Sequence, residues 1–100
     1  MFTFATTVLD HKPILVEFTD GISSSCLEVK LIMAELKTGL SDAIEVIEID
    51  IQHQPDLKKR YQISETPTLM LFQHGELKWK QTGTIGERQL KAIVMNYISD

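Results

Sequence analysis

The sequence predicts an α/β fold, with a central mixed four-stranded β-sheet flanked by α-helices. Short β-branched apolar runs alternate with helical patterns along most of the chain. A long helical pattern separates the first two apolar runs, as a crossover between parallel strands requires, whereas only a turn separates the last two. The 100 residues suffice for one hydrophobic core, so we expect residues 1–100 to form a single domain.

Four runs of strand length are expected to form the sheet, at residues 13–18, 44–51, 68–72 and 77–82. The first, PILVEF, has the apolar character of a strand buried on both faces, interrupted by Glu17. The segment QHGE predicts a hairpin turn with Gly75 at a positive φ. Alternation in the last run predicts that Leu77 and Trp79 both point inward.

Three helical patterns follow the first, second and fourth strands. In the first, one face carries apolar side chains: Val29, Ile32, Met33, Leu36 and Leu40. Gly39 is expected to cap its end, and Pro55 to open a short second helix. Thr84 and Glu87 have the spacing of a capping box for the third. Before Lys12 the sequence supports at most one short strand or two-turn helix.

Composition excludes several classes of function. The net charge of −4 argues against nucleic-acid binding, and no apolar run approaches the length of a membrane span. The three histidines have no ligand-type spacing, so neither a metal site nor a cofactor is expected. The N-terminus lacks the pattern of a signal peptide, and one cysteine requires no oxidising compartment. A cytoplasmic location is therefore expected.

The stretch DGISSSCLEVK, residues 20–30, contains the chain's one cysteine, Cys26, at the start of the first helical pattern. Ser25 and Glu28 are three residues apart, the spacing of a capping box. On that interpretation Cys26 is a small buried apolar side chain, as most free cysteines are. The alternative is that Cys26 is the remaining half of a two-cysteine redox centre.

The chain resembles the thioredoxin family over about residues 13–98. The resemblance depends on PILVEF followed by a helix-opening S-x-x-C, on ETPTLMLF with Pro67, and on Gly83 before the last helix. It implies the thioredoxin fold, with Ser23 at the position of the family's first cysteine and Cys26 at the second. It also implies a cis peptide bond before Pro67, which would expose the Thr66 backbone for pairing with a substrate strand.

In the family, the first cysteine attacks a disulfide as a thiolate and the second resolves the mixed disulfide. A serine hydroxyl is barely ionised near neutral pH, so Ser23 should abolish the dithiol cycle. We therefore expect a redox-impaired module that binds a protein or peptide beside Pro67 as a monomer. Five residues are expected to form the peptide-binding surface: Ile22, Ser23, Thr66, Pro67 and Gly83. Ile85 is expected at its apolar rim.

Two other interpretations remain open at the level of sequence. In one, the chain is an enzyme that uses Cys26 as a single thiol in disulfide exchange, with Glu17 as the base. In the other, Ser23 is an engineered replacement of a cysteine. Glu17 corresponds to a buried aspartate in the family, and Glu48 to a lysine on the adjacent strand; facing carboxylates would raise one pKa. Glu17 could instead reach solvent, or a lysine beyond the strand edge, and have no role.

Overall fold

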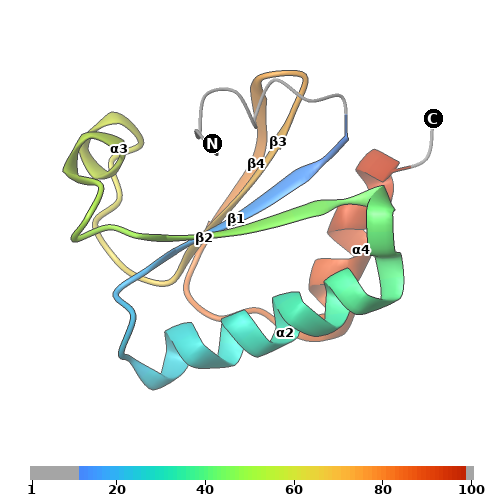
Figure 1. Ribbon diagram of the computed structural model, residues 1–100, viewed down its shortest axis with the longest axis horizontal. Helices are drawn as coiled ribbons and strands as arrows, with labels where there is room; N and C mark the ends of the chain where they lie inside the picture. The colour runs from blue at the N-terminus through green and yellow to red at the C-terminus, as the bar shows by residue number, and fades with distance from the viewer. Residues whose placement is uncertain (1–11, 99–100) are drawn as a thin grey trace.

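The computed structural model describes residues 12–98, shown in Figure 1. Their elements in chain order are β1 (Ile14–Thr19), α2 (Ser24–Leu40), the 3-10 helix η1 (Ser41–Ala43), β2 (Glu45–Asp50), α3 (Pro55–Arg60), β3 (Thr68–Gln73), β4 (Glu76–Thr82) and α4 (Glu87–Ile98). The short element considered before Lys12 lies outside the described residues. The predicted mixed four-stranded sheet flanked by helices is confirmed.

The strands lie in the order β2-β1-β3-β4. β1 is parallel to β2 and antiparallel to β3, and β3 and β4 form the antiparallel hairpin. Helices α2 and α4 lie on one side of the sheet and α3 on the other (Figure 1). Since β1 lies between β2 and β3, the loop that leads from β1 to α2 starts at the centre of the sheet.

The alternation of side chains along β1 divides the core into two layers. Leu15 packs in the layer beneath α2 and α4, while Ile14, Val16 and Phe18 pack in the layer that α3 covers. Every residue of β1 is buried. Glu17 has the same parity as Leu15, and therefore points toward α2 from the middle of this strand.

The prediction that Leu77 and Trp79 share an inward face was wrong for Leu77. The register shifts at Leu71/Phe72, so that Trp79 pairs with Leu71 but Leu77 pairs with Phe72. Leu71 and Phe72 are neighbours in β3 and point to opposite faces of the sheet. Their partners Trp79 and Leu77 therefore also lie on opposite faces. Trp79 packs against the core beneath α2 and α4, whereas Leu77 is exposed on the edge strand.

Two of the predicted helix ends were wrong. Helix α2 continues through Gly39 to Leu40, and the residue with a positive φ at its end is Ser41, at +52°. Lys37 satisfies carbonyls there, because its ammonium donates to the Ser41 and Ile44 oxygens at 2.8 and 2.7 Å. Helix α4 begins at Glu87, so Thr84 lies too early to cap it. No helix within residues 12–98 has the length and apolarity to cross a membrane.

Candidate functional site

The loop between β1 and α2 is organised by the Asp20 carboxylate. Its Oδ1 accepts hydrogen bonds from the backbone N–H groups of Ile22 and Ser23, at 2.9 and 2.8 Å. Gly21 has a φ of +82°, and a Cβ there would lie 3.2 Å from Asp50 Oδ2. Glycine is therefore suited to Gly21 by both its backbone conformation and the limited space.

Ser23 is the N-cap of α2, which corrects the predicted Ser25–Glu28 capping box. Ser23 is extended, with φ −69° and ψ 150°, and its Oγ accepts a hydrogen bond from the Cys26 N–H at 3.3 Å. The Asp20 turn starts the helix one residue before Ser25, so Ser25 already lies inside the first turn. The Ser23 hydroxyl oxygen, which the resemblance aligns with the family's attacking sulfur, thus has a structural role at the helix tip.

Cys26 lies in the first turn of α2 with only 1% of its surface exposed. Its placement agrees with the recessed second position that the resemblance implies. A reagent or substrate in solvent has almost no direct access to the sulfur in this conformation. Slow reaction with thiol reagents therefore follows from burial alone.

The loop before β3 lies against this helix start. The Thr66–Pro67 peptide bond is cis. Thr66 Oγ1 donates to Asp20 Oδ2 at 3.2 Å, joining two loops 46 residues apart in sequence. Within residues 12–98 the Thr66 backbone forms no hydrogen bond, whereas the Pro67 carbonyl accepts one from the Gly83 N–H at 2.8 Å. The N–H and C=O of Thr66 are therefore unpaired among the described residues.

The structure brings most of the predicted peptide-binding residues to one end of the sheet, although their roles stay predictions. Ile22 is 81% exposed beside the Ser23 cap. Thr66 is tied to the same loop through Asp20, and Pro67 is tied to Gly83. Ile85 is not at the rim as expected, because its side chain is buried in the core layer beneath α2 and α4.

Asp20 is the site residue that the sequence interpretation missed. Its pKa lies well below the usual range for aspartate, first because the Ser23 N–H hydrogen-bonds to the carboxylate and then because the Ile22 N–H does. The Ser23 hydroxyl and the Cys26 thiol lower this pKa further. The Asp-Gly pair just before a serine-rich helix start was the available signal. The Asp20 carboxylate therefore carries a negative charge between the β1–α2 loop and the loop before β3.

Glu17 is fully buried, so the interpretation in which it reaches solvent was wrong. It lines a cavity of about 190 Å³ between the sheet and α2, together with Lys30, Met33, Ala34, Val46 and Glu48. Neither carboxyl oxygen of Glu17 has a hydrogen-bond partner among the described residues. Burial without a partner disfavours the charged form of such a group.

Three charged side chains act on Glu17 in addition to burial. Desolvation is the largest cause that raises the pKa of Glu17 from 4.5 to about 7, followed by the negative charge of Glu48. Glu48 lies opposite Glu17 in the parallel register, as predicted. Lys30 lowers the pKa and Asp20 raises it slightly. Lys30 forms an ion pair with Glu48 at 3.6 Å. The positive charge of Lys30 therefore offsets only part of the increase in the pKa of Glu17.

We expect the Thr66→Val substitution to lower the free energy of unfolding by about 1 kcal/mol, because it removes the hydrogen bond to Asp20 at nearly constant volume. Thr66→Ser keeps a hydroxyl and is the matched control. Urea unfolding monitored by far-ultraviolet circular dichroism measures both. Equal losses for valine and serine would show that the hydroxyl does not hold the two loops together.

The fold and the site define a thioredoxin-type domain in which a serine caps the helix and one buried cysteine follows. The family model described as Thioredoxin matches residues 2–96, and the chain belongs to the thioredoxin family. It is 29% identical to Thioredoxin 1 of Chlorobaculum tepidum over 86 residues, which are 86% of this chain and 85% of that protein. It is 31% identical to a thioredoxin of Acidithiobacillus ferridurans over 93 residues, 92% of this chain and 86% of the relative.

A third relative is Thioredoxin Y2, chloroplastic, of Arabidopsis thaliana. It is 34% identical over 85 residues, which are 85% of this chain but only 51% of that protein. The similarity therefore covers nearly all of this chain, while the plant relative has further sequence outside the matched region.

Proposed function

We propose that this protein binds extended segments of partner proteins beside Pro67 and does not turn over disulfides by itself. The observation that supports the proposal most directly is the helix tip, where the Ser23 oxygen caps α2 and the Cys26 sulfur is 1% exposed. A disulfide must be attacked by a thiolate, and no sulfur among the described residues lies at the accessible position.

The binding part of the proposal depends on the loop geometry. The unpaired backbone of Thr66 can add a peptide strand through main-chain hydrogen bonds, and the exposed Ile22 can contact an apolar side chain of that strand. Asp20 fixes both loops relative to each other, so the surface is preformed. We expect the protein to act as a monomer; the cytoplasmic location stays a prediction.

A second candidate function is single-thiol exchange through Cys26. The buried Glu17, with its pKa raised to about 7, is the feature that favours it, because such a carboxyl can accept a proton near neutral pH. Cys26 would then have to become accessible and form a mixed disulfide with an external thiol, and an external reductant would have to release it.

The test combines a reduction assay with a binding assay. With dithiothreitol and insulin, the protein is expected to reduce disulfides no faster than dithiothreitol alone. A fluorescently labelled unfolded polypeptide without cysteine is expected to bind, and Ile22→Asp is expected to weaken binding roughly tenfold. Leu77→Asp, at an exposed position on β4, is the matched control and should leave binding unchanged.

The two assays separate the candidate functions. Turnover that disappears in Cys26→Ala would replace the first proposal by single-thiol exchange. Equal binding by the Ile22→Asp and Leu77→Asp variants would contradict the proposal that the surface beside Pro67 binds the polypeptide.

A further inference from the structure

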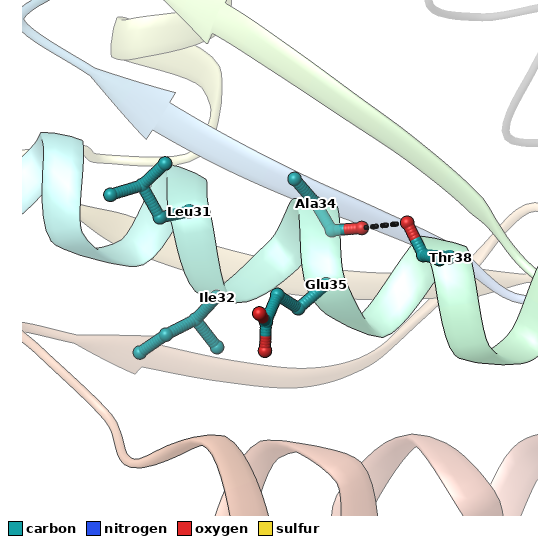
Figure 2. A pocket seen from close by; sticks show the side chains of 5 residues that line it. All are labelled: Leu31, Ile32, Ala34, Glu35 and Thr38. Carbon is teal, nitrogen blue, oxygen red and sulfur yellow. Dashed lines mark hydrogen bonds between the residues drawn. The ribbon is translucent and has the colours of Figure 1, made fainter.

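Helix α2 carries an apolar ridge on its solvent-exposed side. The ridge consists of Leu27, Leu31, Ala34 and Thr38, all exposed, with Leu31 at 68% and Leu27 at 48%. The Thr38 hydroxyl donates to the Ala34 carbonyl at 3.0 Å, so its polar atom is satisfied within the helix (Figure 2). The ridge thus presents mainly carbon to solvent.

A shallow hollow of about 380 Å³ adjoins this ridge. It is lined by Leu31, Ile32, Ala34, Glu35 and Thr38, and Figure 2 shows that all five side chains come from α2. The steps from Leu27 to Leu31, Ala34 and Thr38 are four, three and four residues. This is the spacing of the contact positions along a helix that packs lengthwise against another helix.

The charges beside the ridge differ between its two flanks. Lys30 and Lys37 follow one flank, but Lys30 pairs with Glu48 and Lys37 donates to two backbone carbonyls. Glu28 and Glu35 follow the other flank, one heptad apart and both exposed. Within residues 12–98, the side chain of neither glutamate forms a hydrogen bond or an ion pair. The charge available to a partner is therefore negative.

We propose that the ridge docks an amphipathic helix of a partner protein, with large apolar side chains along its seam and lysine or arginine beside them. The apolar seam would bury Leu27 and Leu31, and the basic side chains would face Glu28 and Glu35. The inference goes beyond the proposed function, because the ridge extends along α2 from Leu27 to Thr38, whereas the strand-binding surface is formed by the loops at the start of α2 and before β3. The ridge is short, so we expect a weak complex whose affinity falls with salt.

A second copy of this chain fits the ridge less well. The Leu-Leu-Ala-Thr seam could pair in parallel only if Lys30 of each copy faced Glu35 of the other. That arrangement would take Lys30 from Glu48, whose charge would then add to the repulsion at the buried Glu17. A basic partner helix leaves the Lys30–Glu48 pair intact.

The experiment is a titration of the isotope-labelled protein followed by amide chemical shifts. The probe is a synthetic three-heptad helical peptide with leucine along its seam and lysine beside it; a second peptide has glutamate in place of lysine. We expect the lysine peptide to shift signals of α2 and to bind at least roughly tenfold more tightly than the glutamate peptide. Leu31→Ser and Glu28→Lys/Glu35→Lys are each expected to weaken binding roughly tenfold.

Two matched variants test whether the ridge itself is responsible. Leu77→Ser removes an exposed apolar side chain elsewhere, and Asp42→Lys/Asp56→Lys makes the same change in net charge at exposed positions outside α2. Both should bind as the unmodified protein does. Equal weakening by Asp42→Lys/Asp56→Lys, equal binding of the two peptides, or self-association that Leu31→Ser abolishes would overturn the proposal. Shifts at Thr66 instead of α2 would overturn it too, while leaving the proposed strand-binding function intact.

Discussion

The Ser23→Cys variant is expected to reduce insulin disulfides with dithiothreitol at least roughly tenfold faster than the unmodified protein. The substitution places a sulfur at the tip of α2, where the side chain is partly exposed and the backbone N–H groups favour a thiolate. Cys26, one helical turn along, is expected to resolve the mixed disulfide in this variant. The measurement is the initial rate of insulin reduction at fixed dithiothreitol concentration.

Two controls define what this gain means. Gln89→Cys adds a second thiol at an exposed position on α4 and should leave the rate at its original value. Ser23→Cys/Cys26→Ala should form a mixed disulfide with the substrate and release it slowly, because no second sulfur is present to resolve it. A Ser23→Cys variant as inactive as Gln89→Cys would show that the surrounding site no longer supports the chemistry.

Asp20 should limit the activity of the Ser23→Cys variant. Its carboxylate is anionic at neutral pH and accepts a hydrogen bond from the backbone N–H of Ser23 at 2.8 Å. A negative charge so close to the introduced sulfur opposes formation of a thiolate. In the Ser23→Cys variant, reaction of the introduced thiol with iodoacetamide should therefore be faster at neutral pH when Asp20 is also replaced by asparagine.

The free energy of unfolding is expected to fall by about 3 kcal/mol as the pH rises through the range from 4.5 to about 7, because of Glu17. Its pKa is higher in the folded protein, so the folded state binds more protons than the unfolded state in this range. Stability is therefore greatest below the unfolded-state pKa and is lost as the pH passes through the folded-state value. Urea unfolding at a series of pH values measures the slope.

Glu17→Gln is the variant that isolates this effect. The amide keeps the shape of the carboxyl but does not ionise, so the difference from the unmodified protein should grow with pH and level off above about pH 8. Glu48→Gln removes the second largest cause of the raised pKa and should move the transition to lower pH. A Glu17→Gln curve parallel to that of the unmodified protein would show that Glu17 does not titrate in this range.

The mixed four-stranded sheet followed from local patterns in the sequence, and the candidate site came from the family resemblance. The β-branched runs predicted the sheet, and the parallel register brought Glu17 opposite Glu48 as expected. The errors came from two features that the strand and helix patterns do not show. An irregularity in the β3–β4 hairpin decided that Leu77 faces solvent, and the Asp20 turn decided which serine caps α2.

The hydrogen bond between Asp20 and Thr66 could not be predicted from the sequence, because it joins two loops whose positions depend on the completed sheet. The exposed ridge on α2 was not predicted from the sequence either. The helical pattern identified the buried face through Val29 and Met33, but it did not show which residues on the opposite face share one apolar surface.

The N-cap hydrogen bond of Ser23 links folding to reactivity. A serine oxygen at this position contributes about 1 kcal/mol to the start of a helix, and sulfur is a much weaker acceptor. Replacing the Ser23 hydroxyl by a thiol would therefore lower the free energy of unfolding and make the side chain at the tip of α2 more nucleophilic. Under the proposed function, the oxygen that caps α2 also leaves the tip of this helix without a nucleophilic sulfur.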